Sequence, residues 1–190
     1  MSNMDDAVNI NQAPATGNSA SPRAKPSAGW AHSAGVVSLT VRKPDRGISA
    51  LDYVEINELF ARYAIAYDER RLDILGSCFE SQGVYQVADV NTRLAKFEGR
   101  DAIVLGIASV QAQQGDEQRR HLMGNVVLNE ISPEIVEAIA YASVTMSGID
   151  GISLQASAIY GALVAKNSGG WLFRNISVGL DSYVGDRPVR

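Results

Sequence analysis

The sequence predicts an α+β domain in which one long helix packs against a strongly curved, antiparallel or mixed sheet. Its 190 residues are 46% hydrophobic, which is enough for one sizeable core. A long amphipathic stretch begins near residue 49, and four strand-like stretches run from residue 119 to residue 182 with only short turns between them. Helices followed by strands joined through short turns are typical of helices that cover one face of an antiparallel sheet.

The long helix is predicted from Ser49 onward. Ser49 is a good N-cap, and Asp52 three residues later completes a capping-box pattern. Apolar residues then recur with the helical period and form one stripe, while Glu58 and Arg62 make a favourable i,i+4 pair on the opposite side. The stripe consists of Ile56, Leu59, Phe60, Tyr63, Ala64 and Tyr67.

The remaining elements follow from turn formers and alternation. A short helix is expected over residues 72–79, and a third helix begins at Gly99-Arg100-Asp101. Ser132-Pro133 is one of the turn-forming pairs between the long strands. The expected strands are 84–90, 92–97, 119–131, 135–147, 152–166 and 170–182.

The chain divides into three parts. Residues 1–48 are expected to be a disordered or loosely attached segment, because the first 35 carry almost no large apolar side chains. Gly35 to Val41 is richer in β-branched residues and could add a strand. The domain is expected over 49–184, with a loose C-terminus at 185–190.

Charge and composition exclude several function classes. Residues 1–48 carry five Lys/Arg and three Asp, a net charge of +2, and the rest carries 12 Lys/Arg against 18 Asp/Glu, a net charge of −6. An acidic domain argues against nucleic-acid binding, which needs clustered cations. Apolar runs are too short for a membrane span, and the acidic N-terminus is unlike a secretory signal, so a cytoplasmic protein is expected.

Metal and disulfide chemistry is also not expected. Cys78 is the only cysteine, and its place in an apolar run indicates a buried thiol. His32 and His121 are the only histidines, too few for the usual zinc sites, so no metal is predicted.

The apolar pattern of one expected strand, residues 135–147, predicts that the sheet packs against a second molecule. Ile139 and Tyr141 alternate with Ala138, Ala140 and Ala142, so both faces of this strand are apolar. A sheet that is apolar on both faces needs cover on both, and the helices cover only one. We therefore expect a homodimer formed through the outer face of the sheet.

Four phrases, in this order of elements, resemble the SnoaL-like branch of the NTF2-like superfamily across residues 49–182. They are RYAIAYD at the end of the long helix, FEGRDAI at the third helix, RRHLMGN on the first long strand and GGWLFRNISV on the last. The resemblance implies a cone, in which the bent sheet wraps around the long helix and a pocket opens in its mouth.

The resemblance also suggests site residues. Asp68 and His121 match an aspartate and a histidine of scytalone dehydratase-like and dehydrochlorinase-like members, and Tyr67 matches a pocket tyrosine of the dehydratases. Tyr63 matches the oxyanion-hole tyrosine of ketosteroid isomerase-like members. This chain departs from both patterns, with Ala142 where dehydratases have a second histidine and Val87 near the isomerases' aspartate.

The same residues suggest a chemistry. An aspartate beside a histidine fixes the histidine tautomer and makes its other ring nitrogen a better base. By helical geometry Asp68 lies about 100° from Tyr67, so it could instead face solvent or pair with Arg70 or Arg71. A lone strand histidine is often only a pocket or core residue.

Met123 and Asn125 share the His121 face by period two, and Tyr160 is a further candidate for substrate contact.

The resulting prediction is a cofactor-free lyase or isomerase, dehydratase-like, that moves a proton on a small apolar cyclic substrate. Asp68 would orient His121, and Tyr63 or Tyr67 would bond the developing oxyanion. Two alternatives remain open at this stage. One is a non-catalytic protein that binds a small ligand in the same pocket, and the other is a dimeric interaction module.

Overall fold

The fold is a six-stranded sheet with helices on its concave face and a short helix on its outer face. The computed structural model describes residues 29–38, 47–89 and 93–183. Among these residues, no helix is long and apolar enough to cross a membrane. The elements are α1 (Trp30–Ser33), α2 (Ala50–Asp68), α3 (Leu72–Ser77), β1 (Phe79–Asp89), β2 (Arg93–Glu98), α4 (Arg100–Ala112), β3 (Gln118–Ser132), β4 (Ile135–Gly148), β5 (Gly151–Asn167) and β6 (Gly170–Tyr183).

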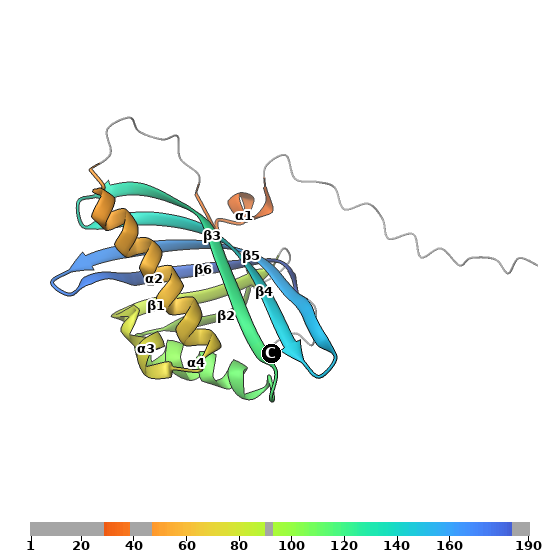
Figure 1. The fold of residues 1–190 in the computed structure, drawn as a ribbon. Coiled ribbons are helices and arrows are strands. Elements are labelled where there is room, and N and C mark those ends of the chain that lie inside the picture. Colours follow the sequence, from red (N-terminus) through yellow and green to blue (C-terminus); the bar gives the residue numbers. More distant parts are fainter. Residues whose placement is uncertain (1–28, 39–46, 90–92, 184–190) are drawn as a thin grey trace, which may run out of the picture.

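The strand order across the sheet is β2-β1-β6-β5-β4-β3. Short turns join β3 to β6 as three successive antiparallel pairs, as the turn formers predicted. β1 pairs with β6 in parallel, so the sheet is mixed. Figure 1 shows α2 lying across the curved sheet, with α3 and α4 beside its C-terminal end. The predicted α+β cone fold is therefore confirmed.

Helix α2 forms where the stripe and the cap predicted it. The Ser49 hydroxyl accepts the Asp52 backbone N–H at 3.0 Å, and the Asp52 carboxylate accepts the Ser49 backbone N–H in return. Glu58 and Arg62 form the expected ion pair. All six stripe residues are buried, with Tyr63 fully so, and its ring packs edge-on against Tyr67, Phe79, Tyr160 and Phe173. The helix is thus the centre of the core that the sheet encloses.

The outer face of the sheet is partly covered by the chain itself. Ala31 and Val37 bury Ile139 in a small second cluster, with Trp30, Val36 and Ile159 packed around it. The segment approaches so closely that a Cβ on Gly161 would lie 2.3 Å from the Val36 carbonyl oxygen. The Trp30 indole N–H donates to Asp181 at 2.6 Å.

This packing corrects part of the prediction for the first 48 residues. Residues 29–38, which include part of the segment expected to be disordered, contain α1 and lie against the outer sheet face. The apolar side chains responsible are few, but they fit over glycines of β5 and β6. Residues 35–38 do not form the added strand, and 39–41 lie outside the described residues.

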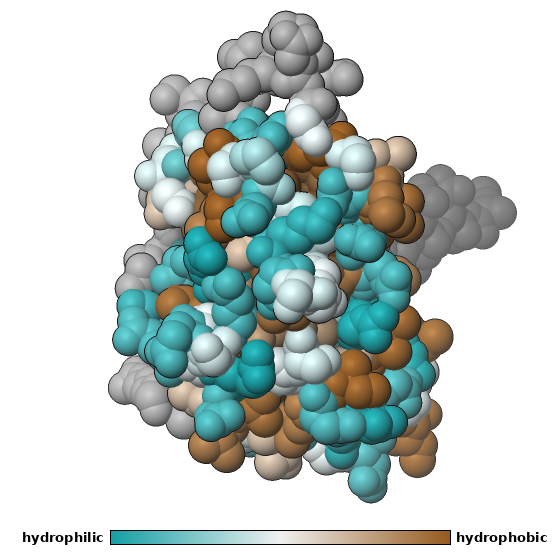
Figure 2. All heavy atoms as spheres, turned by 90° about the vertical axis from the view of Figure 1, so that its left-hand side faces the viewer, coloured by the Kyte–Doolittle hydropathy of each residue, from teal (hydrophilic) through white to brown (hydrophobic). Residues whose placement is uncertain are grey.

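The surface at the strand ends mixes apolar and polar side chains. Figure 2 shows this side, where hydrophobic side chains appear in separate groups between hydrophilic ones. On the outer sheet face, Leu122, Val127 and Tyr141 remain at least half exposed. The apolar outer face that suggested a homodimer is therefore covered only in part.

Candidate active site

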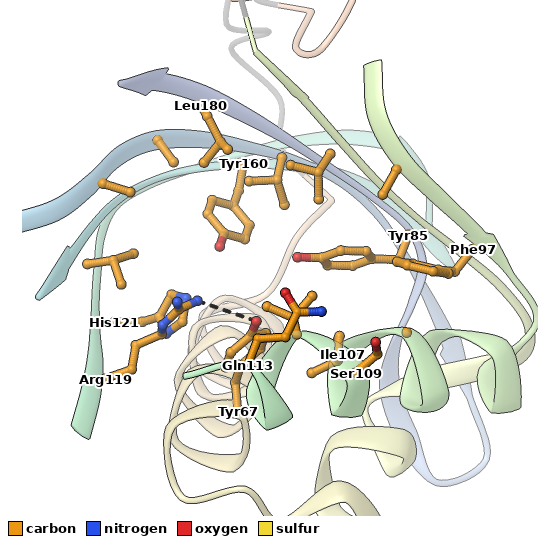
Figure 3. A pocket seen from close by; sticks show the side chains of 18 residues that line it. Tyr67, Tyr85, Phe97, Ile107, Ser109, Gln113, Arg119, His121, Tyr160 and Leu180 are labelled. Carbon is orange, nitrogen blue, oxygen red and sulfur yellow. Dashed lines mark hydrogen bonds between the residues drawn. The ribbon is translucent and has the colours of Figure 1, made fainter. Parts of the chain in front are cut away.

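A cavity of about 310 Å³ lies between the sheet and helices α2 and α4. Its volume is at the lower end of the range for small-molecule pockets. Aliphatic and aromatic side chains make up most of its wall, and a few polar groups enter it (Figure 3). The lining includes Tyr67, Tyr85, Val87, Phe97, Ile107, Ser109, Gln113, Arg119, His121, Tyr160, Val178 and Leu180.

Asp68 and His121 meet at the wall of this cavity. Asp68 Oδ1 lies 2.6 Å from His121 Nδ1, and Asp68 Oδ2 accepts the His121 backbone N–H at 2.7 Å. The two side chains are 5% and 4% exposed. Both carboxylate oxygens are therefore used to hold one residue in place, and the two residues that the sequence paired are in direct contact.

The sheet topology explains why Asp68 points this way. β3 is the last strand of the sheet, so the backbone N–H groups on its open side have no strand partner. α2 packs beside this strand, and its last residue satisfies the N–H of His121. The alternative pairings are not formed, because Arg71 pairs with Asp73 and Arg70 donates to the Gly115 carbonyl at 2.7 Å.

The end of α2 is held firmly around Asp68. Arg70 adopts a left-handed conformation with φ 55°, and the Arg71 and Arg70 N–H groups bond back to the Ala66 and Tyr67 carbonyls. This is the Schellman arrangement, which usually has glycine at the left-handed position.

Two glutamines also bind carbonyls of that last turn. Gln111 donates to the Tyr67 carbonyl at 2.7 Å and Gln118 donates to the Asp68 carbonyl at 3.0 Å. Side chains from α4 and β3 thus fix the carboxylate's position.

The geometry sets the protonation pattern of the histidine. A carboxylate only accepts hydrogen bonds, so the proton of the neutral ring lies on Nδ1 and Nε2 carries the lone pair. His121 lines the cavity, which leaves Nε2 as the ring nitrogen available to a ligand. The Tyr67 ring packs edge-on against the imidazole with ring centroids 4.9 Å apart.

Three tyrosine hydroxyls are also at or near the cavity. Tyr67, Tyr85 and Tyr160 line it, and Figure 3 shows the hydroxyls of Tyr85 and Tyr160 pointing into its interior. Burial raises the pKa of Tyr85 and of Tyr160 well above the usual value of 10. Both hydroxyls therefore stay protonated near neutral pH and can donate hydrogen bonds.

The other predicted site residues lie elsewhere. Tyr63 is buried beneath the cavity wall, and its hydroxyl lies 3.3 Å from that of Tyr85. Met123 packs against the core without lining the cavity. Asn125 is exposed with φ 53°, because β3 bulges between Gly124 and Val127 and the period-two pattern breaks there. Asn125 is therefore not among the residues that line the cavity.

The sequence reasoning missed several residues of the cavity. Arg119 shares the inner face of β3 with His121, and alternation in RRHLMGN could have identified it. Tyr85 and Phe97 come from paired strands whose register only the fold reveals. Gln113 follows α4 directly.

No other reactive group stands out in the described parts of the chain. Cys78 is buried as expected, and burial raises the pKa of its thiol to about 11. Within the same ranges, no group of three or more His, Cys, Asp or Glu side chains could hold a metal ion.

Comparison with known proteins agrees with this architecture. The SnoaL-like domain family matches residues 49–177, most of the chain. The chain therefore belongs to the SnoaL-like domain family. No curated protein matches it.

Several solved structures share the fold at low sequence identity. ActVI-ORFA from Streptomyces coelicolor is 17% identical with a TM-score of 0.59, over 68% of this chain and 97% of that one. A Catenulispora acidiphila protein in complex with S-DNPA is 23% identical with a TM-score of 0.61, over 70% and 95%. A Nostoc punctiforme protein with a cystatin-like fold is 21% identical with a TM-score of 0.59, over 72% and 96%.

Proposed function

We propose that this protein is a cofactor-free lyase or isomerase that moves a proton on a small apolar cyclic molecule. The observation that carries the proposal is the two-point attachment of His121 to Asp68 at the wall of an apolar cavity. Such a pair holds the imidazole ready as a general base, with the carboxylate stabilising the imidazolium that forms.

The proposed reaction begins at Nε2 of His121. This nitrogen takes a proton from a carbon next to a carbonyl group, and the electron pair of the broken C–H bond moves onto the carbonyl oxygen. Return of the proton to a different carbon gives isomerisation. Departure of a leaving group from the neighbouring carbon, which takes up the proton from the imidazolium, gives elimination. Both outcomes balance without an oxidant or reductant.

Tyr67 is the best placed donor for the developing oxyanion. Its hydroxyl accepts a hydrogen bond from Arg119 at 3.4 Å, and acceptance from a cation strengthens a hydroxyl as a donor. It lies on the same cavity wall as His121. Tyr160 is a second candidate donor, whereas Tyr63 does not line the cavity, and its hydroxyl lies 3.3 Å from that of Tyr85.

The cavity wall supports an apolar substrate. Few polar groups reach it, so little water would remain beside a bound ring, and electrostatic interactions are stronger where water is excluded. A structural relative, the Catenulispora acidiphila protein, was solved in complex with S-DNPA, which supports a ligand-binding role for this fold.

The test is proton exchange in deuterated water with a panel of cyclic ketones and β-hydroxy ketones, followed by NMR. We expect the wild type to exchange or convert at least one compound, and His121→Ala to slow this by about 10²- to 10⁴-fold. His32→Ala removes the other histidine, which is exposed on α1, and should leave the rate unchanged.

Binding without exchange, equal in wild type and His121→Ala, would instead support a ligand-binding protein without turnover. A rate unaffected by His121→Ala would remove the assigned base.

A further inference from the structure

Arg119 places a positive charge in the wall of the cavity. The side chain belongs to a residue that is only 8% exposed, and it projects from the inner face of β3 (Figure 3). No Asp, Glu or Lys is among the residues that line the cavity in the described part of the chain. None of the residues that line the cavity in the described part of the chain therefore carries a negative charge to balance that of Arg119.

The described partners of the Arg119 side chain are all neutral. Its guanidinium donates to the Tyr67 hydroxyl at 3.4 Å and lies 5.6 Å from the centre of the same ring. The Gln114 side-chain oxygen, with its amide oriented to satisfy both groups, accepts from the guanidinium at 2.6 to 3.1 Å. A guanidinium has five N–H donors, and these contacts supply two acceptor oxygens.

The neighbouring arginine shows the contrast. Arg120 faces the other side of β3, is exposed, and forms an ion pair with Glu69 at 2.8 Å. Among the described residues, Arg119 forms no such pair. The nearby carboxylate of Asp68 has both oxygens committed to His121. A buried charge is usually paired, since an unpaired one is costly to keep from water.

We propose that the cavity selects a small apolar acid whose carboxylate supplies the missing partner of Arg119. The guanidinium fork fits a planar carboxylate, and the ring of the ligand would lie against Phe97, Ile107 and Leu180. The proposal names the substrate class for the site assigned above, and it rests on that assignment for the choice of cavity.

The same placement positions the ligand for the proposed chemistry. Arg119 and His121 are two residues apart on one face of β3, so their Cα atoms are separated by roughly 7 Å. A carboxylate held by Arg119 therefore leaves carbons a few bonds away within reach of the imidazole. Arg119 would act as the binding and orienting residue, and His121 as the base.

Calorimetry with naphthalene-2-carboxylate and naphthalene-2-carboxamide at neutral pH tests the proposal, because the two probes have nearly the same shape and differ in charge. We expect the wild type to prefer the acid by at least about tenfold. Arg119→Gln should weaken binding of the acid about 10- to 100-fold and leave the amide within about twofold. Arg119→Lys should retain part of the preference, since it keeps the charge but loses the fork.

Arg120→Gln is the matched control and should bind both probes as the wild type does. Circular dichroism of each variant confirms that it folds. Equal binding of acid and amide by the wild type, no binding of the acid, or an unchanged preference in Arg119→Gln would each overturn the proposal. His121→Ala should keep the preference for the acid while losing proton exchange, so the binding proposal and the catalytic proposal can fail separately.

Discussion

At the scale of single residues, the site depends on one carboxylate with two hydrogen-bond donors. Asp68 accepts from both the ring and the backbone of His121, and neither side chain is more than 5% exposed. The backbone contact anchors the carboxylate, and the ring contact then sets the tautomer. The orientation of the histidine is thus determined before any ligand enters.

Replacing this carboxylate should change the histidine tautomer. In Asp68→Asn the amide has one oxygen for two N–H groups, so one donor would face the amide NH₂. We expect ¹⁵N spectra of the wild type to show the Nδ1–H form of neutral His121, and the variant to lose this preference. The free energy of unfolding should fall by about 1–3 kcal/mol. Asp73→Asn, at an exposed aspartate, is the control. The same tautomer in both proteins would contradict the proposed role of Asp68.

At the scale of elements, helix α2 is anchored at both ends. Its C-terminal turn is held by Gln111 and Gln118, which places Asp68. At its N-terminus, Asp52 accepts from Lys166 at 2.6 Å and from the Trp171 indole N–H at 3.0 Å, in addition to the capping contact with Ser49. The helix is therefore tied to the sheet at the end far from the site as well.

The N-terminal anchor should make stability depend on acid pH. The hydrogen bond from Lys166, followed by those from Ser49 and Trp171, holds the pKa of Asp52 well below its usual value of 3.8. A carboxyl whose pKa is lowered by folding stabilises the folded state above its unfolded pKa, and this contribution is lost as pH falls further. Asp52→Asn should therefore lower the free energy of unfolding by about 1 kcal/mol near neutral pH, which is comparable to the loss of a helix cap.

Thermal unfolding measured from pH 7 down to pH 2 checks this. The difference in the free energy of unfolding between wild type and Asp52→Asn should be constant above about pH 5 and should narrow below it. Asp150→Asn, in the exposed turn between β4 and β5, should have the same free energy of unfolding as the wild type. If the difference in the free energy of unfolding stayed constant through the acid range, the stabilisation could not come from ionised Asp52.

At the scale of the whole molecule, the sheet has two differently covered faces. Its concave face holds the helices and the cavity, while residues 29–38 occupy part of the outer face. Small residues on β5 and β6 allow this contact, because a Cβ on Gly179 would lie 2.7 Å from the Trp30 ring. Residues 29–38 are thus part of the packed structure.

Gly161→Ala should displace this segment. The added methyl would meet the Val36 carbonyl oxygen at 2.3 Å, and a backbone atom cannot swing aside as a side chain can. We expect faster amide exchange over residues 30–37 and a red shift of Trp30 fluorescence, with the exchange of β5 and β6 almost unchanged. Gly124→Ala, where the added methyl meets nothing within 4 Å, is the control. Unaltered exchange over residues 30–37 would contradict the packing of α1.

The exposed remainder of the outer face still predicts a homodimer. Leu122, Val127 and Tyr141 are 64%, 50% and 55% exposed there, and burying such side chains against a second copy would be favourable. We expect sedimentation velocity to give a dimer and Tyr141→Arg to shift it towards monomer, with Ile149→Arg in a turn as the control. A wild type that sediments as a clean monomer at micromolar concentration would contradict this prediction.

The sequence by itself determined the elements and their order. The capping box and the period of the apolar stripe placed α2, and turn formers placed the hairpins, because these signals are local and depend only on neighbouring residues. The resemblance to the SnoaL-like family, carried by short phrases of the sequence, suggested Tyr67, Asp68 and His121 as candidates. The α1 packing was not predictable in this way, since it depends on glycines more than 120 residues further along the chain.

Only the tertiary structure decided what the candidates do. Asp68 could have faced solvent, and it faces His121 because an edge strand offers an unpaired N–H beside the end of α2. Asn125 does not line the cavity, because a bulge shifts the alternation of inward and outward side chains along β3. Arg119 lines the cavity, and it has no carboxylate partner among the described residues. Which groups surround a buried charge depends on strand register and helix placement, and these are set by packing across the whole core.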